Sequence, residues 1–175
     1  MYNVCCMDQY AQISPSDLAK YVLRRCGSMS QLKLQKLLYY IQAWHLVGLD
    51  SPLFQEDFQA WVHGPALRSV WDEYKSQSQL NAHLEQSATT GETEKAFASV
   101  LHEDQIDLIN DVLTEYGQRS GYHLECLTHS ELPWTEARAG MSPDEFSDRP
   151  IKKESMKKFY SSLLAAQNGQ EVHAS

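Results

Sequence analysis

The pattern of hydrophobic positions is strongest between Ser30 and Gly48, where the sequence reads SQLKLQKLLYYIQAWHLVG. Ser30 can cap the first turn of a helix, and Gly48 is suited to the left-handed position at its end. One stripe at helical spacing is formed by Leu34, Leu37, Leu38, Ile41, Trp44 and His45. The opposite side leaves Lys36 almost alone as a charge among Tyr39, Tyr40, Ala43 and Val47. A surface helix is mostly polar on its outer side, so this pattern predicts a central helix packed on more than one side.

Weaker patterns around this helix predict further helices and one short strand. The expected helices run from Ser14-Pro15 to about Gly27, from Gly64-Pro65 onward, from Asp104, from about Ser120, and from Lys152 to about Leu164. Residues 57–63 (DFQAWVH) alternate apolar and polar side chains, as a strand does. The stretches 75–99 and 140–150 are expected to be loops, the first with at most short helical pieces.

These elements predict a mainly α fold: a compact single-domain helical fold with a central helix and a minor short β element. The chain has 175 residues, of which 42% are hydrophobic, and this is enough for one well-buried core. We expect residues 1–13 to form an N-terminal tail, residues 14–165 a single helical domain and residues 166–175 a C-terminal tail.

Charge and cysteine usage narrow the class of protein. The formal net charge of -8 disfavours nonspecific attraction to nucleic acids and anionic membranes. The four cysteines, Cys5, Cys6, Cys26 and Cys126, have neither the spacing of a disulfide framework nor that of a zinc site, so reduced thiols are expected. The N-terminus lacks a basic start before an apolar run, and no stretch approaches the roughly 18 apolar residues of a membrane span. We therefore expect a cytoplasmic protein that contacts neither a membrane nor nucleic acid.

The residues that could carry chemistry give weak signals. The 7 histidines never pair at the spacing of a helical zinc site, so we predict no metal and no cofactor, and we interpret His45 as a core residue. Thr128, His129 and Glu131 have the types of a nucleophile, a base and an orienting acid, but residues so close in sequence rarely reach the required geometry. The favoured interpretation is structural, with Thr128 and His129 tying a helix end to backbone and Trp134 filling the core. The sequence has no Gly-rich phosphate loop, GxSxG elbow or CxxC pair, so an enzyme is not expected.

Several separate motifs resemble those of one known family. They are the run Leu34-Gln35-Lys36-Leu37-Leu38-Tyr39-Tyr40 with Gln42-Ala43-Trp44, then Ala60-Trp61-Val62-His63-Gly64-Pro65, then Leu127-Thr128-His129 and Pro133-Trp134. In this order they resemble the Panacea antitoxin domain, the phage-associated family that includes GepA-like and SocA-like proteins. The resemblance covers roughly residues 16–160. The departures are small: His63 stands where the family often has Tyr or Arg, and Val70-Trp71 replaces a frequent Val-Tyr.

The resemblance implies an antitoxin of a bacterial or prophage toxin–antitoxin pair, which neutralises a co-encoded toxin by direct binding and catalyses nothing. An alternative within the same class is an adaptor that delivers the toxin to a AAA+ protease. A hydrolase or metal-dependent enzyme using Thr128, His129 and Glu131 is the alternative of a different class. A nucleic-acid-binding regulator is a third, which the acidic charge balance opposes.

We expect toxin contact on a face near the central helix and the Gly64-Pro65 turn. The predicted toxin-binding residues are Lys36, Tyr39, Tyr40, His63, Gly64 and Pro65. Lys36 and Tyr39 are expected on the less buried side of the helix, where aromatic side chains and a cation would contribute to an interface, although the Tyr39–Tyr40 pair fits a core equally well. The remaining motif residues are assigned structural roles: Leu34, Gln35, Leu37, Gln42, Trp44, Trp61, Thr128, His129, Pro133 and Trp134. Of these, the three tryptophans are expected to be mostly buried.

Overall fold

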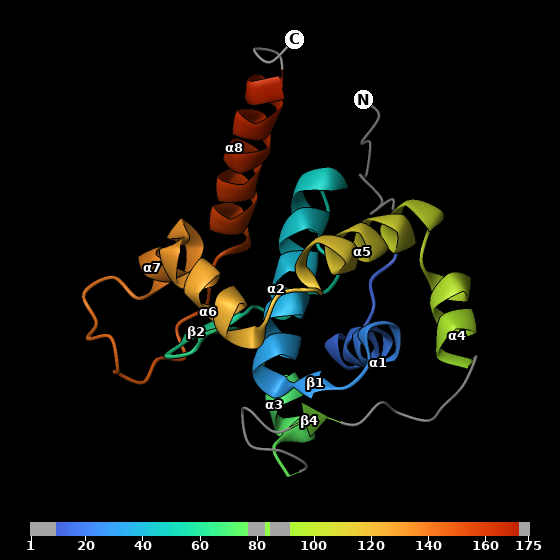
Figure 1. Ribbon diagram of the computed structural model, residues 1–175, viewed down its shortest axis with the longest axis horizontal. Helices are drawn as coiled ribbons and strands as arrows, with labels where there is room; N and C mark the ends of the chain where they lie inside the picture. The colour runs from blue at the N-terminus through green and yellow to red at the C-terminus, as the bar shows by residue number, and fades with distance from the viewer. Residues whose placement is uncertain (1–9, 77–82, 85–91, 172–175) are drawn as a thin grey trace, which may run out of the picture.

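The computed structural model describes residues 10–76, 83–84 and 92–171, and it is mainly helical, as the sequence predicts (Figure 1). In chain order the elements are α1 (Pro15–Cys26), β1 (Met29–Ser30), α2 (Gln31–Gly48), β2 (Gln59–Trp61), β3 (Gly64–Ala66), α3 (Arg68–Tyr74), β4 (His83–Leu84), α4 (Glu92–Val100), α5 (Glu103–Tyr116), α6 (Gly121–Ser130), α7 (Leu132–Ala137) and α8 (Lys153–Glu171). The strands form small antiparallel pairs, β1 with β4 and β2 with β3. The β structure is therefore minor, as expected.

Helix α2 runs through the middle of the molecule, with α1, α5, α6, α8 and β3 packed around it (Figure 1). Ser30 caps it by accepting a hydrogen bond from the backbone N–H of Lys33 at 3.2 Å. Leu38, Tyr39 and Tyr40 follow one another and so point in directions about 100° apart around the helix axis. All three are 0% exposed, so every side of the helix is covered and the prediction of a central helix is confirmed.

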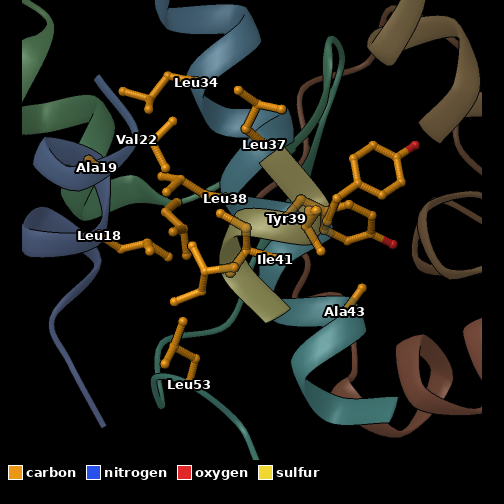
Figure 2. Close-up of a cluster of buried hydrophobic side chains, with 14 of the residues drawn as sticks. Leu18, Ala19, Val22, Leu34, Leu37, Leu38, Tyr39, Ile41, Ala43 and Leu53 are labelled. Carbon is orange, nitrogen blue, oxygen red and sulfur yellow. The ribbon is translucent and has the colours of Figure 1, made fainter. Parts of the chain in front are cut away.

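The main apolar core begins where α1 packs on α2. Figure 2 shows Leu18 and Val22 of α1 beside Leu38 and Ile41 of α2, with Leu53 from the following loop closing the cluster. The start of α1 is fixed by Ser14, whose side chain accepts the backbone N–H of Asp17, as the sequence predicts. Each of these buried leucines would cost about 2 to 5 kcal/mol if cut back to alanine, so this layer holds α2 in place.

The segment after the predicted strand differs from the prediction. Gly64-Pro65 does not begin a helix but forms β3, which pairs antiparallel with β2 so that Ala60 is opposite Pro65. Gly64 has φ 93°, which lets the chain reverse directly after β2. Helix α3 begins only at Arg68. The predicted strand at 57–63 is correct in type but shorter, because regular pairing is confined to Gln59–Trp61.

Three other boundaries also differ from the prediction. Part of the expected 75–99 loop is helix α4, and residues 83–84 form β4, while residues 77–82 and 85–91 lie outside the described part of the chain. The last helix continues past Leu164 to Glu171. Gly48 belongs to α2, and the left-handed residue after this helix is Asp50, with φ 52°.

The described part of the expected N-terminal tail is tied to the domain. The backbone N–H of Ile13 donates to the Leu53 carbonyl at 3.1 Å, and the Gln105 amide donates to the Ala11 carbonyl at 2.9 Å. Residues 1–9 and 172–175 lie outside the described ranges. Within those ranges no helix combines the length and the apolar character needed to cross a membrane.

Candidate functional site

Three of the sequence motifs meet at the side chain of Lys36. This lysine is 1% exposed, and its Nζ donates to the carbonyl of Pro65 at 3.0 Å. A Cβ added to Gly64 would lie 2.6 Å from Lys36 Cε and 2.9 Å from Thr128 Oγ1, so only glycine leaves room for both. Burial lowers the pKa of Lys36 to about 7, while the Glu125 carboxylate acts in the opposite direction. The central helix, the β2–β3 hairpin and α6 are thus locked together around one enclosed amine.

Two glutamines of α2 bind the loops that cross it. The Gln35 amide accepts from the N–H of Leu67 at 2.8 Å and donates to its carbonyl at 3.2 Å. The Gln42 amide accepts from the N–H of Leu53 at 2.8 Å and donates to the carbonyl of Phe54, also at 2.8 Å. A buried backbone group without a partner costs free energy, and each amide satisfies two such groups. These glutamines therefore position the hairpin and the preceding loop on the central helix.

A second buried charge, Glu131, lies at the start of α7. Its carboxylate accepts hydrogen bonds from the hydroxyl of Tyr160 at 2.5 Å and from that of Tyr40 at 3.3 Å. Tyr40 in turn stacks on Tyr116, with ring centroids 4.1 Å apart. Burial raises the pKa of Glu131 to about 7, and the two tyrosine hydroxyls oppose this rise. The carboxylate joins α2, α7 and α8 through side chains that are far apart in sequence.

The outer surface of the hairpin carries aromatic and charged side chains, and we call Trp61, His63, Arg68 and Trp71 the hairpin face. The rings of Trp61 and Trp71 meet edge to face at 5.5 Å, and the guanidinium of Arg68 lies 4.6 Å from the ring centroid of Trp61. His63 Nδ1 is 2.8 Å from Glu125 Oε1, and its side chain is 60% exposed. Tryptophan and arginine are the residue types most enriched among interface hot spots.

The underside of the hairpin is held by α7 and the residue after it. Trp134 Nε1 donates to the Trp61 carbonyl at 3.0 Å, and Arg138 Nη1 donates to the Ala60 carbonyl at 2.9 Å. Arg138 also binds the carbonyls of Ser142, Pro143 and Glu145. Pro133 is buried within α7. The hairpin face therefore stands on a fixed support.

The possible catalytic trio does not assemble into a relay. The Thr128 hydroxyl donates to the Glu125 carbonyl at 2.9 Å, and the His129 ring stacks on Trp134 at a centroid distance of 4.0 Å. Glu131 is bound by tyrosines instead of by His129. A nucleophile needs its base within hydrogen-bond reach. The Thr128 hydroxyl and the Glu131 carboxylate have other partners, and the buried Nε2 of His129 has no hydrogen-bond partner among the described residues.

The burial assigned to Lys36 and Tyr39 by sequence reasoning is wrong. Both were expected on the less buried side of the central helix, but they are 1% and 0% exposed. Tyr40 is equally buried, and Gly64 and Pro65 are buried residues of strand β3 within the hairpin. Among the six predicted toxin-binding residues only His63 is exposed. Lys36 is buried because β3 and α6 cover the side of the helix that carries it.

The other motif residues occupy the core and its edge. Leu34 and Leu37 are fully buried, and His45 is a core histidine whose ring contacts the Ser51 carbonyl and the Gln105 amide, as predicted. Trp44, Trp61 and Trp134 are half-buried, less than was expected. Trp44 Nε1 donates to the Tyr116 hydroxyl at 3.1 Å, and each of the others has a partner on the hairpin.

Sequence reasoning missed Arg138 and Tyr160. Arg138 is 6% exposed and reaches several backbone carbonyls, although nothing in the local sequence TEARAG marks it as buried. Tyr160 lies within the expected last helix, but its bond to Glu131 depends on a tertiary contact between α7 and α8. In the described ranges no group of three His, Cys, Asp or Glu side chains has a geometry that could hold a metal ion, and Cys26 and Cys126 are free thiols.

Comparison with known families gives one match. A family model described as "Antitoxin SocA-like, Panacea domain" matches residues 34–135. This range begins within α2 and ends in α7, so it contains Lys36, the hairpin face and Glu131. Searches of curated proteins and of solved structures returned no match.

Proposed function

The chain belongs to the family of SocA-like antitoxins with a Panacea domain, and on this premise we propose that it neutralises a co-encoded protein toxin by direct, stoichiometric binding. The observation that carries the proposal is the match over residues 34–135, which contains every motif that meets at Lys36. The partner is a cognate toxin encoded nearby, and binding takes place in the cytoplasm. No cofactor or metal is needed.

Toxin contact on the hairpin face is the second part of the proposal. His63 and the outer edges of Trp61, Arg68 and Trp71 are the contact groups, because they combine exposure with residue types that dominate interfaces. Lys36, Tyr39, Tyr40, Gly64 and Pro65 act from below by fixing the hairpin on α2. A surface that is fixed before binding loses less conformational entropy when the partner docks, which favours affinity.

Binding without turnover is supported by the arrangement of Thr128, His129 and Glu131. The Thr128 hydroxyl binds a backbone carbonyl, the His129 ring stacks on Trp134, and the Glu131 carboxylate binds tyrosine hydroxyls. A hydrolase would require these groups to be available to one another and to a substrate. We therefore assign this cluster to support of the fold.

The test is co-expression with the protein encoded by the adjacent open reading frame. Expression of that protein alone should stop growth, and expression of both should restore it. Calorimetry with the two purified proteins should give a fixed, near-equimolar stoichiometry. Rescue at far below equimolar ratio would contradict stoichiometric neutralisation. A fall in toxin level that requires a AAA+ protease would instead favour the adaptor mechanism.

The hairpin face is tested in the same calorimetric experiment with Arg68→Ala and Trp71→Ala. Loss of a hot-spot side chain typically weakens binding by about 2 kcal/mol or more, roughly thirtyfold in affinity. Ser142→Ala is the control, since Ser142 is exposed, lies outside the hairpin face and forms its hydrogen bonds to Arg138 and Glu145 through backbone groups, which the substitution keeps. Unchanged affinity in both variants, with unchanged melting temperatures, would move the interface elsewhere.

A further inference from the structure

An open groove of about 560 Å³ is lined by residues from the C-terminal half of α2, from α5, α6 and α8, and by Glu131 at the start of α7. Figure 1 shows α8 rising beside α2, with its last turns extending beyond the body of the molecule. The apolar lining includes Trp44, Val47, Leu108, Leu127, Leu163 and Leu164. Leu164 is 38% exposed, and Trp44 and Val47 are only half-buried. The volume is that of a typical ligand cleft, and exposed apolar surface of this kind marks a binding site more often than chance.

The charges of this groove are mainly negative. Asp111, Glu115 and Glu131 line it, and Arg119 is the basic residue in the lining. Arg119 already pairs with Glu115 at 2.5 Å. The groove thus presents an excess of negative charge next to apolar surface, which is complementary to a segment that is both apolar and basic.

Glu131 is the position in the groove where a basic side chain of a partner would bind. Glu131 is 6% exposed. Its carboxylate accepts hydrogen bonds from the hydroxyls of Tyr40 and Tyr160, which are both neutral donors. Among the described residues, no lysine, arginine or histidine forms an ion pair with it. A buried carboxylate without a cation is costly, and burial accordingly raises the pKa of Glu131 to about 7. A cation brought in by a partner would offset that cost.

We propose that the groove between α2, α5 and α8 binds an apolar segment of the toxin that carries a lysine or arginine, and that this cation pairs with Glu131. The proposal rests on the proposed function, because it takes the toxin as the occupant. It adds a second contact region, separate from the hairpin face, and a chemical requirement on the toxin sequence. The apolar side chains of the segment cover Leu164 and Val47, and its basic side chain reaches the start of α7.

The other occupants fit the groove less well. A second copy of this chain would approach with a net charge of -8 against an acidic groove, which opposes association. A small apolar amine would satisfy Glu131 but would leave much of the apolar lining on α8 uncovered. Sedimentation tests the second copy below, and loss of toxin binding in Leu164→Glu and Glu131→Gln distinguishes the toxin segment from a small amine.

The experiment measures binding of the protein encoded by the adjacent open reading frame to three variants of the full chain. Leu164→Glu places a charge in the apolar lining, and Glu131→Gln removes the charge while keeping the shape of the side chain. Ala165→Glu is the matched control, since it adds the same charge at the neighbouring, exposed position of α8 outside the lining. We expect Leu164→Glu and Glu131→Gln each to weaken binding about tenfold or more, and Ala165→Glu to change it by less than about twofold.

The outcomes separate this inference from the proposed function. Failure of the parent protein to bind or rescue would overturn both. Binding of the parent that is unchanged in Leu164→Glu and Glu131→Gln, with circular dichroism and melting temperature also unchanged, would overturn the groove assignment alone. Sedimentation of the protein by itself is the further check, because a self-associated parent that Leu164→Glu makes monomeric would identify a second copy as the occupant. If Leu164→Glu unfolds, Glu131→Gln still decides the question.

Discussion

Lys36 and Glu131 are two buried charges of opposite sign on either side of α6, and their surroundings differ. Lys36 is enclosed by Gly64 and Thr128, and its amine is bound by a backbone carbonyl. Glu131 lies beneath an open groove and is bound by side chains from two helices. A charge that is sealed by the chain itself can serve only the fold, whereas a charge at the floor of a groove is within reach of a partner.

The same physical cause acts on both groups with opposite results. Burial disfavours the charged form, so it lowers the pKa of Lys36 to about 7 and raises the pKa of Glu131 to about 7. Each group therefore gives the stability of the protein a pH dependence, and the two dependences have opposite slopes in separate pH ranges. Substitutions at each region test whether the surroundings of Lys36 are closed and whether Glu131 is accessible.

The largest effect is expected from closing the space around Lys36. Gly64→Ala would place a methyl group against Lys36 Cε and Thr128 Oγ1 at a residue with φ 93°. Steric overlap and backbone strain together should lower the free energy of unfolding by about 4 kcal/mol. Gly140→Ala is the matched control, because Gly140 has φ 79° but nothing within 4 Å of the added carbon. Chemical denaturation of both variants measures the difference, and equal losses would show that the enclosure of Lys36 is loose.

A second prediction concerns the pH dependence caused by Lys36. A depressed lysine pKa contributes stability that is present above the unfolded value of 10.5 and is lost as the pH falls to about 7. The unfolding free energy should therefore rise by about 3 to 4 kcal/mol between pH 7 and pH 10, relative to Lys36→Met, which cannot titrate. Glu125, His63 and His129 are present in both proteins, so the difference between the two curves arises from the amine of Lys36 and its interactions with these neighbours. Parallel pH curves for the two proteins would mean that water reaches Lys36.

Much of the fold follows from local signals in the sequence, and the enclosure of Lys36 does not. The starts of α1 and α2 depend on Ser14 and Ser30, which act on backbone within three residues. Whether Lys36 is exposed depends on Gly64 and Thr128, which are remote in sequence. Helical spacing can place Lys36 on the less apolar side, but it cannot show which segments cover that side.

The candidate site was predictable to a similar degree. Its motifs identified the hairpin and the residues beneath it, but the residues expected to contact a toxin proved to be buried, apart from His63. The groove was not predicted, because its lining comes from α2, α5, α6 and α8 and no single stretch shows it. Helix α4 was missed for a local reason. Among the residues of α4 whose burial is described, Phe97 alone is buried, so the segment lacks an apolar stripe.

A third prediction concerns the pH dependence of stability caused by Glu131. A raised carboxyl pKa contributes stability that is fully present below the unfolded value of 4.5 and is lost as the pH rises through about 7. The unfolding free energy should fall by about 2 to 3 kcal/mol between pH 5 and pH 8, relative to Glu131→Gln. The groups that face the carboxylate are Tyr40, Tyr160 and the more distant Arg119, and burial raises the pKa of both tyrosines away from this range. If toxin binding supplies a cation, the loss should be smaller in the complex than in the free protein.

The smallest effect on stability is expected on the hairpin face, at His63. Its side chain is 60% exposed and contacts Glu125 at the surface of the molecule, so His63→Ala should change the free energy of unfolding by less than about 0.5 kcal/mol. The same substitution should weaken binding of the co-encoded toxin several-fold, because His63 is the exposed member of the predicted contact residues. His123→Ala is the matched control, since it removes an exposed histidine at the start of α6 outside the hairpin face. Denaturation and calorimetry on the two variants separate the effects: a change in binding with constant stability fits a contact surface, whereas a loss of stability at His63 would show that this edge of the hairpin supports the closed region around Lys36.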